Sequence, residues 1–442
     1  MSGKYLITGG HIFTLDDSVG DFDNDAILVE NGIIKAIGKA SEISAPDAEV
    51  IDATEGVIIP GMVDAHRHVS MSLTRGIGVD QHLWHFLSNT YTRWLPATGV
   101  EEMYTSALVG ALEAIESGVT TIMDTWKSFH SAEHAESELQ GLKDSGTRAF
   151  FCYGMSGDHT WGKMVGEDSG EGLVRVALQL SQSGTTPFAW MNDEVKLAQD
   201  KGLLCCLPLE RRTRLQPDER LGGQGGYVMS LISETGGKIV LSPDTDIRMS
   251  MGFPPLRLAL AHGLNPALSI DTSSAVPPDL LSQMRLQLQR VSLKMDFGVR
   301  DALVWGMRNG AEAVGLGDKI GTLKPGQRAD IVVITNKRAL SGSANPLGTA
   351  VRHSTSADID LVMVDGKILK RDGKLVGVDV DSIRAKSREG LRRIQANLRS
   401  MRPEMSPEEI RNFFLQGEKA HRVNVANAYA QGTQVADYLR PA

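Results

Sequence analysis

Gly61-Met62-Val63-Asp64-Ala65-His66-Arg67-His68 closes an apolar run that begins at Val57. The run is typical of a buried strand, and it ends on two histidines that are separated by one residue. Residues two apart on a strand point to the same face, so the two imidazoles converge. Imidazole nitrogens are common ligands of Zn²⁺ and Fe²⁺. The stretch therefore predicts a metal-assisted hydrolase that uses His66 and His68 as its first two ligands.

Size, charge and cysteine content exclude several other classes of protein. The 442 residues are 41% hydrophobic and carry a formal net charge of −8, which argues against a nucleic-acid or membrane-surface partner. No segment approaches the roughly 18 apolar residues of a membrane span, and the N-terminal residues lack the features of a signal peptide. The three cysteines are too few for a disulfide framework. We therefore expect a cytoplasmic protein that acts on a small molecule.

Strand-like and helical runs alternate along the middle of the chain. The expected strands after the first one span residues 119–123, 149–153, 174–180, 203–207, 238–242 and 267–270. Such alternation over about 250 residues is typical of a parallel α/β barrel or of a doubly wound sheet. We favour a (β/α)₈ barrel, because the histidine pair follows the first strand, where barrel active sites are built.

Both ends of the chain differ from the middle in their predicted secondary structure. Residues 5–56 contain short strands with a hairpin signal at Asn31-Gly32, and similar strands recur at 329–334 and 361–366. We predict a small β-sandwich domain formed by residues 1–56 and 325–380, a barrel over 57–324, and a helical extension over 381–442. The long extension offers a surface to a neighbouring subunit, so we expect a homo-oligomer.

Four segments in order carry a resemblance to a known family. They span residues 59–68, 117–124, 268–271 and 309–330. Over roughly residues 5–380 the chain resembles the amidohydrolase superfamily, in its cytosine/guanine deaminase and chlorohydrolase-like branch. The resemblance implies a (β/α)₈ barrel with a small β domain. It also implies a metal ion held by the first-strand histidines, by one histidine each after the fifth and sixth strands, and by an aspartate after the eighth.

The resemblance assigns roles to individual residues. His66 and His68 match the first two metal ligands, and Asp271 matches the eighth-strand aspartate, which also takes a proton from the attacking water. The alternatives are a hydrogen-bonded histidine pair at a strand end and an aspartate that caps a helix or turn. Asp124 ends the second strand, where it could support a ligand histidine.

The fifth strand departs from the family pattern. Glu210 matches the glutamate that serves as general acid and base, but Leu207 occupies the position of the metal-binding histidine. Cys205 or Cys206 could supply a thiolate instead. Cysteines of this kind are more often small core residues.

The sixth-strand histidine is missing as well. Residues 211–226 contain two leucines, one proline and four glycines, a composition that predicts loop and leaves the sixth strand degenerate. Further histidines follow the early strands, although each is more typical of a surface loop: His82, His85, His130, His134 and His159. The readable ligand set, His66, His68 and Asp271, is thus incomplete, although three protein ligands suffice for a catalytic zinc.

Three functional hypotheses follow. The first is a deaminase or amidase that cleaves a non-peptide C–N bond of a small cyclic substrate with water activated by Zn²⁺ or Fe²⁺. The second is a metal-free isomerase, lyase or cyclase that uses His66, His68 and Asp271 as acid/base groups. The third is an inactive relative with a disrupted region at 207–226.

Overall fold

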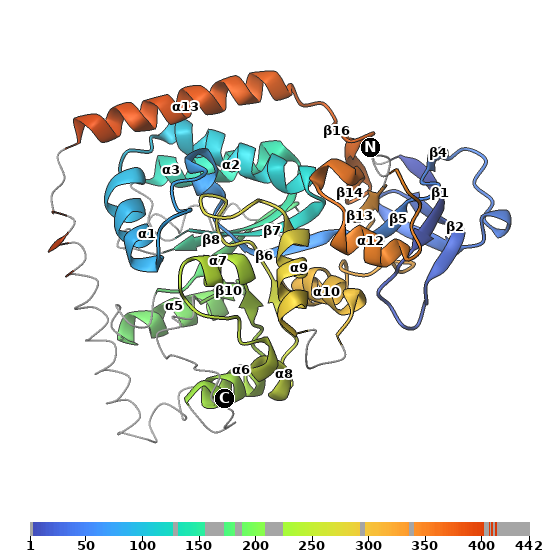
Figure 1. Ribbon diagram of the computed structural model, residues 1–442, viewed down its shortest axis with the longest axis horizontal. Helices are drawn as coiled ribbons and strands as arrows, with labels where there is room; N and C mark the ends of the chain where they lie inside the picture. Colours follow the sequence, from blue (N-terminus) through green and yellow to red (C-terminus); the bar gives the residue numbers. More distant parts are fainter. Residues whose placement is uncertain are drawn as a thin grey trace.

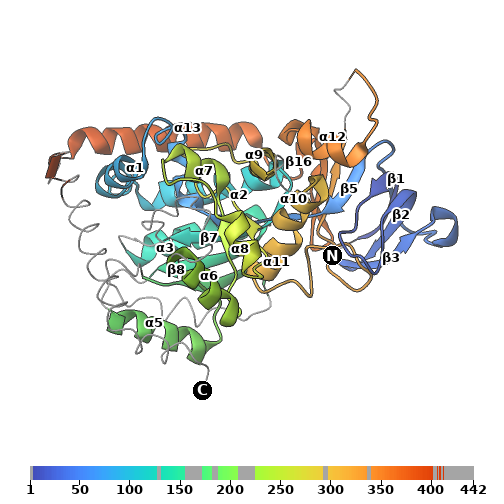
Figure 2. The ribbon, with the colours of Figure 1, turned by 60° about the horizontal axis from the view of Figure 1, so that its bottom comes forward.

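A computed structural model describes residues 3–126, 131–154, 172–181, 188–207, 224–291, 297–335 and 340–401, together with positions 406, 408, 409 and 412. The molecule has mixed α/β architecture. A sheet built from both ends of the chain lies at one end of the molecule, and the curled parallel sheet lies beside it (Figures 1 and 2). None of the described helices is both long and apolar enough to cross a bilayer.

The curled sheet carries the expected barrel strands. They are β6 (Met62–Arg67), β7 (Val119–Trp126), β8 (Arg148–Gly154), β9 (Val174–Gln179), β10 (Cys205–Cys206), β11 (Val240–Leu241) and β12 (Ala267–Leu268). Strands β6 to β10 pair in parallel in chain order, and β11 pairs with β12. A parallel bridge between Arg67 and Asp271 links the segment after β12 to the end of β6. The described strands therefore form a curled five-stranded parallel sheet and a separate two-stranded one, and the second returns to the first strand through this single bridge.

Helices lie around this sheet and beside the sheet of the two chain ends (Figures 1 and 2). Their bounds are α1 (Leu83–Asn89), α2 (Val100–Glu116), α3 (Ala132–Ser145), α5 (Phe188–Lys201), α6 (Gln224–Glu234), α7 (Pro243–Arg248), α8 (Leu256–Ala261), α9 (Leu280–Val291), α10 (Val299–Gly306), α11 (Arg308–Ala313), α12 (Pro346–Arg352) and α13 (Val380–Ser400). Helix α2 forms because apolar residues recur at helical spacing on the face that it buries. Small and apolar side chains such as Val63, Ala65 and Cys152 fill the inside of the barrel.

The predicted loop at 211–226 is only partly within the described residues. Residues 208–223 lie outside them, and helix α6 begins at Gln224. The expectation of loop is therefore wrong for residues 224–226. Their glycines precede Val228, Met229, Leu231 and Ile232, whose helical spacing extends the helix backwards over them. In the part of the chain that the structure describes, no strand lies between β10 and β11.

The strands of the two chain ends pair with one another. They are β1 (Lys4–Ile12), β2 (Phe22–Glu30), β3 (Ile33–Gly38), β4 (Glu49–Asp52), β5 (Val57–Pro60), β13 (Ile331–Ile334), β14 (Ile359–Val364), β15 (Lys367–Arg371) and β16 (Lys374–Leu375). They form one nine-stranded sheet in which β5 joins β1 to β13. Since β5 leads directly into β6, this sheet fixes the start of the strand that carries the histidine pair.

Helix α13 lies along α2 on the outside of the molecule (Figure 1). The amide of Asn397 donates a hydrogen bond to the Ala97 carbonyl over 2.9 Å, and Arg393 pairs with Glu101 at 2.9 Å and with Glu102. Ile394 is buried against this surface. The polar helix expected at the start of the extension is therefore docked through a narrow face, while its other side is exposed.

Candidate metal centre

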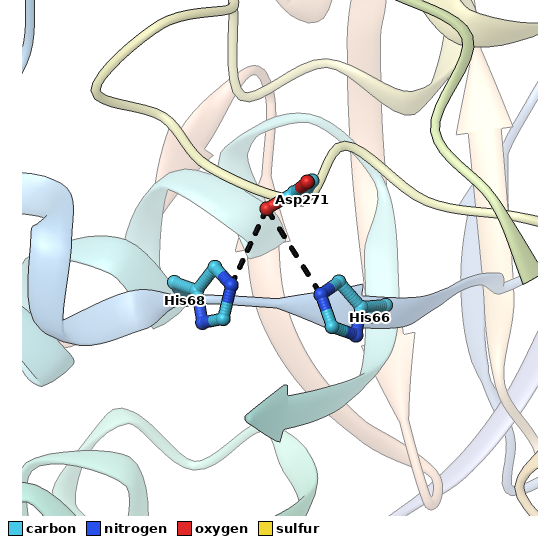
Figure 3. A group of neighbouring side chains, drawn as sticks. All are labelled: His66, His68 and Asp271. Atoms are coloured by element: carbon cyan, nitrogen blue, oxygen red, sulfur yellow. Dashed lines mark ion pairs between the residues drawn. The ribbon is translucent and has the colours of Figure 1, made fainter. Parts of the chain in front are cut away.

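His66, His68 and Asp271 come together at the carboxyl end of β6, as Figure 3 shows. The Nε2 atom of His68 lies 3.3 Å from Asp271 Oδ1, and that of His66 lies 3.9 Å from the same oxygen. Each residue can offer one ligand atom such that all three atoms lie within 4.8 Å of one another. All three side chains are partly exposed. This is the constellation that the sequence predicted.

Backbone hydrogen bonds hold Asp271 beside the histidine pair. Its N–H donates to the carbonyl of His66 over 3.1 Å, and its own carbonyl accepts from the N–H of His68 over 2.8 Å. Asp271 has a φ of 67°, a left-handed conformation that aspartate tolerates better than most residues. The carboxylate is therefore aimed by a local turn that pairs with β6, and not by a regular strand.

Thr125, at the end of β7, orients both imidazoles. Its carbonyl oxygen faces His68 Nδ1 in a short contact, and its hydroxyl lies 3.4 Å from Nδ1 of each histidine. A carbonyl only accepts, so His68 carries a hydrogen on Nδ1, which leaves the Nε2 lone pair of the neutral ring facing the carboxylate of Asp271. Two acceptors at 3.3 Å repel unless a metal ion or a proton lies between them. The donor set therefore suits a Zn²⁺ or Fe²⁺ ion.

A buried ion pair ties together the two segments that carry the three residues. Asp64 and Arg67 are both fully buried and lie 3.3 Å apart, Oδ2 to Nη1. Asp64 Oδ1 also accepts a hydrogen bond from the N–H of Ile270 over 3.2 Å. Burial raises the pKa of Asp64 to about 6, against the opposing effect of Arg67. The pair links β6 to the residue before Asp271, a role that the sequence did not reveal.

Asp124 holds the backbone directly after the histidine pair. Its Oδ1 atom accepts a hydrogen bond from the N–H of Val69 over 3.2 Å, directly after His68. Burial raises the pKa of Asp124 to about 7. Burial and the nearby charge of Asp124 raise the pKa of Glu138 in α3 well above its usual value. The support that we expected from Asp124 therefore acts on the turn after the ligand.

These two acids make the stability of the fold depend on pH. Because their folded-state pKa values exceed those of an unfolded chain, the folded state binds more protons above about pH 4, and stability falls as pH rises. Glu138→Gln removes one such group, so we expect its stability relative to the parent protein to grow between pH 5.5 and 8.5, by up to about 1.4 kcal/mol per pH unit. Urea unfolding of metal-free protein measures this. Glu136→Gln, at an exposed position of the same helix, is the control, and an equal pH dependence in both variants contradicts the prediction.

Tyr91 lies near Asp271 on the π-helical segment Thr90–Trp94. Burial, together with the negative charge of Asp271, raises the pKa of Tyr91 to about 12. The phenol therefore stays protonated beside the site. Sequence reasoning missed this residue, because the segment has no motif and comes close to Asp271 only in the folded chain.

Tyr91→Phe should lower kcat/KM by roughly 10–100-fold, the value of a hydrogen bond to a charged or reacting group, and leave the fold intact. Steady-state kinetics measure the effect. Tyr104→Phe is a matched control, since the hydroxyl of Tyr104 also faces a carboxylate, Asp144 at 2.8 Å, on the outer helices. Equal values of kcat/KM in the two variants would show that the hydroxyl of Tyr91 does not contribute to the reaction.

The other predicted residues either lie outside the described residues or have other neighbours. Glu210, His130 and His159 lie outside the described residues. His82 and His85 stack on each other with ring centroids 3.9 Å apart, and His134 Nδ1 contacts the Ser131 hydroxyl at 2.9 Å. Among the described residues, the metal-compatible group consists of His66, His68 and Asp271.

The cysteines of the fifth strand do not join that group either. Cys206 packs on the core inside the barrel, and Leu207 directly after it is 39% exposed. Burial raises the pKa of Cys205, and burial and a hydrogen bond with Cys206 raise that of Cys152 well above its usual value. Protonated thiols are poor ligands. The interpretation as a small core residue therefore agrees with the geometry of Cys206, whereas Cys205 is exposed, and neither belongs to the metal-compatible group.

Similar proteins share most of the length of this chain. The 5-methylthioadenosine/S-adenosylhomocysteine deaminase of Pyrococcus furiosus is 28% identical over 398 residues, which cover 81% of this chain and 93% of the relative. The 5′-deoxyadenosine deaminase of Methanothermobacter thermautotrophicus is 27% identical over 414 residues, covering 84% and 94%.

Solved structures show the same fold. An adenosine deaminase from Xanthomonas campestris with bound zinc has a TM-score of 0.76 at 19% identity, covering 89% of this chain and 99% of that one. An atrazine chlorohydrolase from Arthrobacter aurescens complexed with zinc has a TM-score of 0.73 at 19% identity, covering 88% and 100%. The sequence model of the Amidohydrolase family matches residues 57–207 and 192–369. Since these matches extend over more than half of the chain and agree with its predicted motifs, the protein belongs to the amidohydrolase family.

Proposed function

We propose that the protein is a metal-dependent deaminase that releases ammonia from an amino-substituted heteroaromatic ring of the adenosine type. The observation that carries the proposal is the convergence of His66 Nε2, His68 Nε2 and Asp271 Oδ1 at the end of β6. The names of the similar proteins, several of which are adenosine-type deaminases, support the choice of substrate class.

The reaction replaces the ring C–NH₂ by C–OH and consumes one water for each ammonia released. When bound to the three residues, Zn²⁺ or Fe²⁺ polarises water and lowers its pKa toward neutrality. The carboxylate of Asp271, whose Oδ1 faces both histidines, would accept the proton of the attacking water through its other oxygen. Thr125 keeps the histidine Nε2 atoms turned toward the site. Glu210 remains a predicted acid for the leaving ammonia.

The metal-free alternative has one observation in its favour. Leu207 follows β10 at the position of the family's fifth-strand histidine, so this chain offers three ligands where the resemblance implies five. Three ligands with an open position are sufficient for a catalytic zinc. The alternative predicts turnover that persists in protein stripped of metal.

Metal analysis and turnover by the full-length protein test the proposal. We expect about one Zn²⁺ or Fe²⁺ per chain by plasma mass spectrometry, and ammonia release from 5′-deoxyadenosine or 5-methylthioadenosine, followed by the ultraviolet change of the purine ring. Loss of turnover on chelation and its return with added Zn²⁺ support the metal-dependent reaction. Stoichiometric metal with no ammonia release from either nucleoside contradicts the substrate class.

We also infer the domain organisation that the sequence predicts: a small β-sandwich of residues 1–56 and 325–380, a barrel of 57–324 and an extension of 381–442. The antiparallel bridge between Ile33 and Arg328, with hydrogen bonds from Ile34 N–H to Gln327 and from Ala329 N–H to Gly32, supports the composite domain. The exposed outer side of α13 supports a homo-oligomer, and the three free cysteines support a cytoplasmic location.

A further inference from the structure

A cavity of about 410 Å³ opens at the other end of the curled sheet from the metal centre. Arg148, the first residue of β8, and Arg175, the second residue of β9, line one side of it. Residues 316–328 and Asp365 line the other side. A seven-residue strand spans about 20 Å, so this cavity is distinct from the site around His66.

Two of the four cationic side chains that line the cavity are held by carboxylates. Arg148 pairs with the buried Asp330 and lies 3.4 Å from Asp365. Arg328 donates a hydrogen bond to Asp365 Oδ2 over 2.7 Å. One carboxylate, Asp365, thus serves two guanidinium groups and fixes them along the cavity wall.

Arg175 is different, because the structure gives its charge no carboxylate within 4.0 Å among the described residues. Its Nε atom is buried without a hydrogen-bond partner, and its guanidinium carbon lies 6.0 Å from the centre of the Phe150 ring. A buried donor that is left unpaired costs free energy, and such a group in a native protein indicates a missing partner. The planar fork of a guanidinium matches a carboxylate or phosphate group.

The remaining walls are apolar. Leu173, Leu316 and Ile320 line the cavity next to Phe150, whose ring already contacts Arg175. Lys319 adds a further positive charge, and Asp318 is the one other acid that lines it beside Asp365. The volume lies within the usual range for small-molecule sites. The lining therefore combines a charged wall with an apolar wall, and the cavity is large enough for a small ring.

We propose that this cavity binds a small organic oxyanion, a carboxylate or a phosphate monoester with a compact apolar body, through the guanidinium of Arg175 with Arg148 beside it. The ligand bridges β8 and β9 to the segment 316–328. Its binding stabilises the folded chain by mass action and does not compete with the substrate at the metal centre.

Calorimetry and thermal unfolding of the full-length protein test this with benzoate, phenyl phosphate and the neutral isostere benzamide. We expect one or both anions to bind and to raise the melting temperature, and benzamide to do neither. Binding of benzoate alone or of phenyl phosphate alone identifies the preferred anion. Arg175→Leu should weaken anion binding about tenfold or more, and Arg175→Lys, which keeps the charge, should weaken it less.

Two control variants separate this site from other sources of anion binding. Arg384→Leu, on the exposed part of α13, removes the same charge elsewhere and should bind like the parent protein. His66→Ala should also keep anion binding, because the metal centre is not involved. The proposal is overturned if neither anion binds, if benzamide binds equally, if Arg175→Leu binds like the parent protein, or if His66→Ala loses binding.

Discussion

Replacing His66 by alanine is expected to remove the bound metal ion and to reduce deamination by at least about 10³-fold. The variant keeps two of three ligand atoms, fewer than a catalytic zinc requires. Loss of only a hydrogen bond to a metal-bound histidine costs about 10–100-fold, so loss of the ligand itself costs more. Since His66 is partly exposed at a strand end, its removal leaves the core intact.

Metal content per chain and the rate of ammonia release measure this effect together. His353→Ala is the matched control, because His353 is exposed at the end of α12, beside the small sheet. The control should keep both metal and turnover. A His66→Ala protein that retains stoichiometric metal and full activity would exclude the proposed centre. If metal-stripped parent protein keeps its turnover while His66→Ala loses it, the metal-free acid/base hypothesis replaces the metal-dependent one.

Asp271→Asn should lower kcat by about 10²–10⁴-fold, the usual contribution of a positioned acid/base group, with little change in melting temperature. Asparagine tolerates the left-handed backbone at φ 67° as aspartate does. Its amide cannot take the proton of the attacking water, and it is a weaker metal ligand. The substitution thus removes the chemistry and preserves the turn that pairs with His66 and His68.

Kinetics, metal content and thermal unfolding of two variants separate the catalytic effect from the conformational one. Asp372→Asn makes the same change at an exposed residue with a φ of 52°, and it should behave like the parent protein. Asp271→Ala should lose activity to a similar extent, and also lose about 1–2 kcal/mol of stability because alanine tolerates that φ poorly. Normal turnover by Asp271→Asn would exclude the carboxylate from the reaction.

Much of the site could be predicted because its signals are local. His66 and His68 share one strand end, and Asp271 follows a short apolar run with a recognisable pattern. Strands such as β7 and β8 were predicted within a few residues, since apolar runs between amphipathic helices are strong signals. Helix α6 was harder, because two of its first four residues are glycines, which suit a loop, and only the apolar spacing after them favours a helix.

The sequence by itself determined the family, the parallel α/β middle and the identity of the three converging residues. The tertiary structure alone decided how they act together. Thr125 matters through a carbonyl oxygen that every residue possesses, and Asp64 through an N–H at Ile270, 206 positions away. Tyr91 and the unpaired Arg175 likewise depend on neighbours far along the chain. Periodicity and motifs depend on residues that are close in the sequence. Contacts between residues far apart in the sequence form only when the whole chain packs, so the sequence patterns do not reveal them.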